Sequence, residues 1–292
     1  MRKNIAVRFQ HPGSETDSKY FNPNGLCRWK SKPINVDYNV HSRKYLITDG
    51  LYLNDMSGGI EDGKIGFWGE WEAESYVETN KNFRKTSQII QLPQYFHYPV
   101  KPIATPSQPG IHFENTDPCV FGGNFYYSNC QQPNEKSKYL KNLIKGDVII
   151  FGSTLSPRDK KLFMIDTVFV VKEKIPYTPS KAKQILGQKV PDWFFNLTLE
   201  LLPEEEYVLY IGATYNDPVE GMFSFFPCVP INFQPDGFLR PTLKSGKIEY
   251  LTKSGQTQGT GRVWGFDSNT VWNVVAEDIL NQGLCLGVYA EI

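Results

Sequence analysis

The apolar residues of this chain come in short runs that alternate with polar residues and end at glycine, proline or aspartate. At the start, Ile5, Val7 and Phe9 alternate with their neighbours, which predicts a half-buried opening strand that ends at His11. Residues 163–171 are apolar on both faces and predict a central strand. The pattern therefore favours many short strands.

Two turn signals belong to this pattern. The pair Asp49 and Gly50 separates two runs of strand-forming residues, and an Asp-Gly pair suits a two-residue type I′ turn. We therefore predict a β-hairpin centred on this pair. The Lys-Gly-Asp run at 145–147 predicts a tight turn that opens a buried strand.

The stretch 63–75 combines indoles, carboxylates and glycines on one predicted strand that continues through Val77. With a period of two, its side chains fall on two faces: Ile65, Phe67, Gly69 and Trp71 on one, and Gly66, Trp68, Glu70 and Glu72 on the other. The first face predicts a core face, and the second a bent strand surface beside a binding site. The alternative is a solvated strand face with a bulge.

Residues 80–118 are rich in proline and aromatic residues. Proline at this density excludes a regular helix and a central strand, so we predict a long loop that forms a lid or a ligand wall. The alternative is a linker. Residues 1–292 are accordingly predicted to form one large β-rich unit, with a possible division into 1–115 and 116–292.

Two helices and a last strand complete the pattern. A helix is predicted to start at Ser268 or Asn269 and to end at Gly283, and a short one is predicted over 181–187. Residues 284–289 predict a closing strand, a candidate partner for the opening strand. The fold class is mainly β (α+β), with a barrel-like or sandwich core, a few short helices and a long Pro-rich loop.

Composition agrees with that fold class and limits the function. Aromatic residues make up 14% of the 292 residues, which favours strands over a helical bundle. Basic and acidic residues number 31 each, so no global field directs the protein to nucleic acid. The charges form blocks, however: residues 136–189 are rich in lysine, and residues 192–220 are acidic without a single base.

Cysteine and histidine usage points to a reduced compartment without metal. The five cysteines and four histidines are scattered without metal-ligand spacing, so we expect no disulfide framework, no metal and no cofactor. The chain shows no secretory signal and no apolar run of membrane-spanning length. We expect a cytoplasmic protein without a membrane partner, and its oligomeric state stays open.

The middle of the chain resembles a known group of domains. The segments Phe-Gly-Gly-Asn-Phe-Tyr-Tyr-Ser-Asn-Cys-Gln at 121–131, Gly-Asp-Val-Ile-Ile-Phe-Gly-Ser at 146–153 and Ile-Asp-Thr-Val-Phe-Val-Val at 165–171 resemble the nucleotide-modification-associated domains of phage and bacterial mobile elements. The Lys-Gly-Asp strand start is also similar to PUA, ASCH and EVE barrels. The resemblance, confined to 121–171, implies a β-barrel that binds nucleic acid and in some cases reads a modified base.

Three acidic residues are candidates for catalysis. Glu70 and Glu72 are predicted to share a strand face, where paired carboxylates divide acid and base roles. Asp117 stands with His112, Glu114 and Cys119, an imidazole–carboxylate–thiol group. For each of these groups, an ordinary structural role is the competing interpretation.

Binding needs fewer special groups than catalysis. Candidate ligand-binding residues, which stack on a base or read its edge, are Trp68, Trp71, His112, Tyr126, Tyr127 and Asp166. Candidate phosphate-binding residues are Lys141, Lys145, Arg158, Lys160 and Lys161.

These residues lead to one main hypothesis and two alternatives. The main one is a protein of a phage or bacterial conflict or modification system that binds a nucleic acid or a nucleotide. The first alternative is a hydrolase or transferase acting on a nucleotide or glycosidic bond through Glu70, Glu72 or Asp117. The second is a protein–protein interaction component that uses the acidic block at 192–220.

Overall fold

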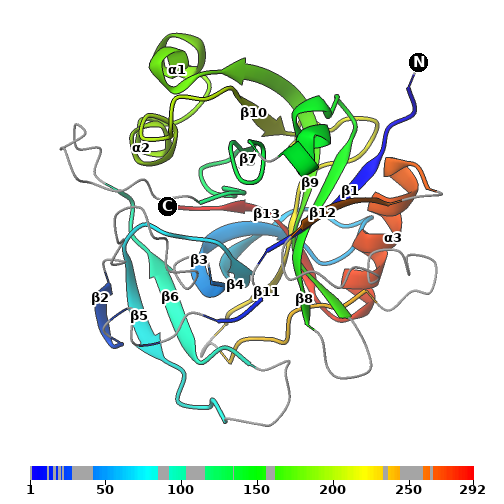
Figure 1. Ribbon diagram of the computed structural model, residues 1–292. Helices are drawn as coiled ribbons and strands as arrows, with labels where there is room; N and C mark the ends of the chain where they lie inside the picture. Colours follow the sequence, from blue (N-terminus) through cyan, green and yellow to red (C-terminus); the bar gives the residue numbers. More distant parts are fainter. Residues whose placement is uncertain are drawn as a thin grey trace.

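The computed structural model describes residues 2–11, 13–15, 18, 21, 23–27, 42–84, 92–102, 116–133, 135–155, 162–232, 236–243, 259–263 and 266–292. Over these residues the chain is mainly β, as predicted, with two sheets and short helices at their margins (Figure 1).

The first sheet contains the opening strand. Its order is β12-β1-β8-β9-β10-β7, with β1 parallel to β8 and antiparallel to β12. Its strands are β12 (Gly259–Val263), β1 (Ala6–Gln10), β8 (Val148–Leu155), β9 (Leu162–Tyr177), β10 (Tyr207–Gly212) and β7 (Tyr126–Tyr127). The predicted central strand is confirmed, because β9 lies between β8 and β10.

The second sheet contains a small closed barrel. Its order is β13-β11-β4-β3-β6-β5-β2, and β13 also pairs with β3, so that β13, β11, β4 and β3 form a ring. Its strands are β13 (Cys285–Ala290), β11 (Phe226–Pro230), β4 (Glu61–Gly69), β3 (Lys44–Leu53), β6 (Tyr95–Pro99), β5 (Ser75–Thr79) and β2 (Gly25–Cys27). Both sheets contain strands from 1–115 and from 116–292.

The helices are short and lie at the margins of the sheets. They are α1 (Pro179–Leu186), α2 (Asp192–Phe194), which continues into a π-helical turn, α3 (Ser268–Asn281) and the 3₁₀ helix Glu135–Asn142. The two predicted helices are thus confirmed, but Asp267 caps α3: its side chain accepts a hydrogen bond from the Thr270 N–H. In Figure 1, α1 and α2 lie together beyond β10, away from β2 and β5.

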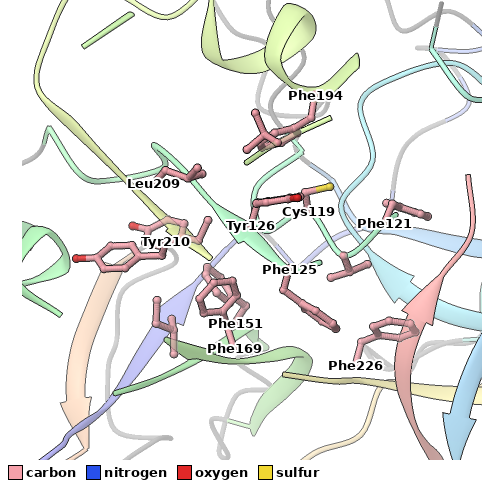
Figure 2. Close-up of a cluster of buried hydrophobic side chains, with 14 of the residues drawn as sticks. Cys119, Phe121, Phe125, Tyr126, Phe151, Phe169, Phe194, Leu209, Tyr210 and Phe226 are labelled. Atoms are coloured by element: carbon pink, nitrogen blue, oxygen red, sulfur yellow. The ribbon is translucent and has the colours of Figure 1, made fainter. Parts of the chain in front are cut away.

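Strand β8 shows why the first sheet is apolar on both faces. Ile149 and Phe151 belong to one hydrophobic cluster, which also contains Phe67 and Phe226 of the second sheet. Val148 and Ile150 point the other way, into a second cluster that contains the buried face of α3. Figure 2 shows the first cluster, in which Phe125 and Phe226 approach with ring centroids 6.2 Å apart.

The prediction of a hairpin at Asp49 and Gly50 is wrong. Strand β3 runs straight through both residues, and Gly50 pairs with Gly63 of β4. Gly50 is needed for close packing instead of a turn, because a Cβ there would lie 2.5 Å from the carbonyl oxygen of Tyr289. The chain turns later, between β3 and β4.

The prediction of a long loop over 80–118 is also wrong for the centre of this range. Residues Tyr95–Pro99 form β6, an interior strand parallel to β3 and antiparallel to β5. The prolines of this stretch do not interrupt the strand, because Pro93 precedes it and Pro99 is its last residue. Residues 85–91 and 103–115 lie outside the described residues.

Three smaller expectations have mixed outcomes. The closing strand β13 pairs with β11 and β3, so its predicted pairing with β1 is wrong. The predicted strand 63–77 is two strands, since β4 ends at Gly69 and β5 starts at Ser75. The predicted turn before β8 is confirmed: Gly146 adopts a φ of 88°, and the Asp147 N–H donates to the Ile144 carbonyl.

Candidate functional site

Glu70 lies in a buried group of charges where β1 and β4 end and β3 begins. Its Oε2 is 3.3 Å from Nδ1 of His11 and 3.3 Å from Nη1 of Arg43, which donates a hydrogen bond to it. The side chains of all three residues are buried. The face of Glu70 that sequence analysis assigned to a surface is therefore interior.

Asp166, on β9, lies between two guanidinium groups. Its Oδ2 is 3.2 Å from Nε of Arg43, and its Oδ1 is 3.9 Å from Nη1 of Arg240. Burial raises the pKa of the Asp166 carboxyl, while the two arginines oppose that rise. The structure thus brings together, through Arg43, two acidic residues that are almost a hundred positions apart in the sequence.

Arg240 is held on several sides. Its Nη1 donates to the Ser153 hydroxyl at 2.9 Å, and its Nη2 donates to the Gly13 carbonyl. Its guanidinium also lies 5.0 Å from the centroid of the Trp68 ring. Burial lowers the pKa of Arg240 to about 10, despite the attraction of Asp166.

Glu15 is the last member of this group. Its carboxylate accepts hydrogen bonds from the backbone N–H groups of Gln94 and Tyr95, at 2.9 and 3.0 Å. Burial raises the pKa of Glu15 to about 7, although these two donors and the charge of Arg240 act in the opposite direction.

We call Glu15, Arg240, Asp166, Arg43, Glu70 and His11 the charge chain, because acidic and basic groups alternate along it. The polar groups in and beside the charge chain are not all hydrogen-bonded. Nη2 of Arg43, both carboxylate oxygens of Asp166 and the neighbouring Ser42 hydroxyl have no hydrogen-bond partner within the described part of the protein. Polar groups of this kind can hold a water molecule or a small polar ligand.

Asp117 has a structural role. Its carboxylate accepts hydrogen bonds from the backbone N–H groups of Ser128, Asn129 and Cys130, at 2.8 to 2.9 Å. Burial raises the pKa of Asp117 to about 6, and the nearby Glu72 adds to the rise while the three donors oppose it. Asp117 therefore anchors the loop after β7, and Glu72 lies close to it.

The thiol of the imidazole–carboxylate–thiol group is buried. Burial raises the pKa of Cys119 to about 12, so this thiol is not an activated nucleophile. The two other members, His112 and Glu114, lie outside the described residues. The five cysteines form no disulfide with one another.

The four candidate aromatic residues are packed in the interior. Trp68, Trp71, Tyr126 and Tyr127 expose at most 3% of their surface. Trp71 packs against Phe121. Tyr126 stacks on Phe194, with ring centroids 5.2 Å apart; both residues are labelled in Figure 2. None of the four presents a ring face to solvent, so base stacking on them requires a conformational change.

The lysine-rich block faces the acidic block. Lys183 pairs with Asp192 at 3.1 Å, and Lys172 pairs with Asp217. Another exposed lysine of the block, Lys189, pairs with Glu173. The two blocks thus neutralise each other in part, which sequence analysis did not foresee.

A hollow of about 410 Å³ on this side is lined by three other lysines of the block. Lys141, Lys174 and Lys181 line it, and Glu206 is the one acidic residue among the described residues of its lining. The lining also includes Tyr177, Tyr207 and apolar residues from β9, β10 and α1. We call this feature the basic hollow.

The basic hollow contains only part of the predicted phosphate site. Lys141, in the last turn of the 3₁₀ helix, was predicted, and Lys145 is exposed but does not line the hollow. Arg158, Lys160 and Lys161 lie outside the described residues. Sequence analysis missed Lys174 as a site residue, although its alternation with Ile175 and Tyr177 is the signal for an outward position on a strand.

Comparison with known proteins identified no matching family model, curated protein or solved structure. Within the described ranges, no group of three or more His, Cys, Asp or Glu residues is placed to hold a metal ion. No helix found in those ranges is both long and apolar enough to cross a membrane.

Proposed function

We propose that this protein binds a nucleic acid or a nucleotide and that the phosphate groups of this ligand occupy the basic hollow. The observation that carries the proposal is the excess of cations in one concave place, with Lys141, Lys174 and Lys181 around Glu206. Phosphate oxygens are the common partners of such lysines.

The electrostatics of Lys174 support an anionic ligand. Its pKa is lowered, first by partial burial and then by the positive charge of Arg2. When two cations lie near each other, an anion that binds between or beside them stabilises their charged forms. Arg2 itself hydrogen-bonds to the carbonyl of Asn142, at the end of the helix that carries Lys141, and it also pairs with Asp147 at 2.6 Å, which compensates part of its charge.

A role in a phage or bacterial conflict or modification system, with recognition of a modified base, belongs to the same proposal. It is supported by the resemblance of 121–171 to nucleotide-modification-associated domains. That segment includes β7 and β8.

Binding measurements with single- and double-stranded DNA and RNA, plain and base-modified, and with free nucleotides test this proposal. We expect binding that weakens as salt concentration rises, because phosphate contacts release counterions. Absence of salt-dependent binding to every one of these ligands would refute it.

A second candidate function is acid–base catalysis at Glu70 on a nucleotide or glycosidic bond. The specific observation in its favour is the contact of Glu70 with an imidazole and a guanidinium, 3.3 Å from each. Glu70→Gln, Glu72→Gln and Asp117→Asn test this alternative in a hydrolase assay with nucleotide and glycoside substrates. An activity that survives all three substitutions rules it out.

A further inference from the structure

We infer that the basic hollow takes a phosphate monoester, either a nucleoside monophosphate or the terminal phosphate of a strand. The internal phosphodiester backbone of a nucleic acid is the ligand that the inference excludes. This inference rests on the proposed function and narrows the class of ligand that the protein binds.

Lysines without an acidic partner lie inside the hollow. Lys172, Lys183 and Lys189 flank the region but are each paired with an acidic side chain. Lys141 and Lys174, inside the hollow, have no ion-pair partner among the residues that the structure describes. The hollow thus brings Lys141 and Lys174 together in one compact place, whereas tracking a nucleic-acid backbone requires a groove lined with cations.

The net charge of the hollow favours a dianionic ligand. Among the described residues, the lining of the hollow carries three lysines and one glutamate, an excess of two positive charges, although Glu204 attracts Lys181 from outside the lining. A phosphate monoester has a charge of about −1.5 to −2 near pH 7, while each internal phosphodiester has a single negative charge. The dianion therefore matches the hollow better than the monoanion.

The size and the apolar part of the hollow also suit a nucleotide-sized ligand. The volume of about 410 Å³ suits one small ligand, in the range typical of ligand pockets. Beside the lysines the lining contains Pro176, Ile185 and Val208, so an apolar wall adjoins the charged one. Ile185 is 37% exposed and available for contact with a sugar or base.

The test compares ligands that differ only in the terminal phosphate. Binding of adenosine 5′-monophosphate is measured against adenosine, and a single-stranded DNA 12-mer with a 5′-phosphate against the same strand without it. The inference predicts at least tenfold weaker binding without the monoester in both pairs. It also predicts that Lys174→Ala abolishes this preference, while Lys145→Ala, at an exposed lysine outside the hollow, leaves it unchanged.

The outcomes separate the inference from the proposed function. Equal, salt-dependent binding of both 12-mers would overturn the inference and leave nucleic-acid binding standing. No binding of any of the four ligands would overturn the inference, and the proposed function falls as well if the wider panel of nucleic acids also fails. A monoester preference that survives Lys174→Ala would also overturn the inference, because the phosphate would then be held elsewhere.

Discussion

Arg43 shows most clearly what a single residue does in the charge chain. It contacts both Glu70 and Asp166 in the interior, so its removal leaves two buried carboxylates without their shared cation. Breaking a buried ion pair from one side is costly because the remaining charge is left uncompensated. Arg43 is thus a structural bridge between β9 and the end of β4.

We predict that Arg43→Ala lowers the free energy of unfolding by about 3–5 kcal/mol, as measured by urea denaturation. The double variant Arg43→Ala with Asp166→Asn should lose less than the sum of the single variants, because the neutral carboxamide at position 166 no longer needs a cation. Lys64→Ala, at an exposed lysine on β4, is the control and should change stability by less than about 0.5 kcal/mol. Additive effects of the two substitutions would contradict this account of Arg43.

Glu15 should give the protein a pH-dependent stability. Its folded pKa of about 7 lies above the ordinary value of 4.5, mainly because of burial. Between these values the folded state binds more protons than the unfolded state, so stability is highest at low pH and falls as pH rises through 7. The contribution is about 3 kcal/mol at most, since each pKa unit corresponds to about 1.4 kcal/mol.

Glu15→Gln is the matched variant for that prediction. The carboxamide oxygen can still accept from the Gln94 and Tyr95 N–H groups, but it cannot ionise. Urea denaturation at pH values from 5 to 8 should show a smaller fall of stability in the variant than in the wild type. Parallel curves for the two proteins would show that Glu15 does not titrate in this range.

At the scale of elements, β3 illustrates how a local signal is overridden by packing. The Asp-Gly pair suits a turn, but β3 is long enough to pair with β4, β6 and β13. These pairings close the small barrel, and Gly50 allows β13 to approach closely. A pattern that identifies a turn from two residues contains no information about such a non-local partner.

We predict that Gly50→Ala destabilises the protein by about 1–3 kcal/mol. The added Cβ would collide with the Tyr289 carbonyl oxygen and with Ile65, and a backbone atom cannot move away without disturbing β13. Gly59→Ala is the control, since a Cβ there meets nothing within 4 Å. Thermal unfolding of the two variants compares them directly, and equal midpoints would mean that β13 does not pack on β3 as described.

Strand β6 is an exception to the rule that a proline-rich stretch contains no interior strand. Proline density correctly excluded a helix over residues 80–118, yet Tyr95–Pro99 is an interior strand because its prolines stand at the ends. The strands β8 and β9 were predictable, since burial on both faces leaves a continuous apolar run. Strand β1 was predicted from its alternation as half-buried, but it is buried on both faces, with Arg8 and Gln10 in the interior. Pairing partners were not predictable in the same way, as the incorrect partner for β13 shows, because they depend on distant segments.

For the whole molecule, the fold decides which charges are available for a ligand. The acidic block at 192–220 supplies Asp192 and Asp217, which neutralise two lysines of the basic block. Counting charges along the sequence therefore overestimates the basic surface. Of the predicted phosphate residues with described surroundings, Lys141 lines the basic hollow and Lys145 does not.

The candidate site could be predicted in its residue types more than in its geometry. Glu70 and Asp166 were recognised as unusual, but their common partners Arg43 and Arg240 were not, because neither belongs to a motif. Asp117 was recognised as a candidate catalytic residue and turned out to accept three backbone hydrogen bonds. A sequence identifies a carboxylate out of place, while only the fold shows which donors surround it.

The central claim is that the basic hollow is the phosphate-binding site of this protein. The most direct measurement is the affinity and salt dependence of nucleotide and DNA binding for the double variant Lys141→Ala and Lys174→Ala, with Lys64→Ala as the control. Our account predicts that the double variant binds at least about tenfold more weakly and that its log–log salt slope falls by about one or two. Unchanged affinity and slope in the double variant, with the wild type binding measurably, would contradict it.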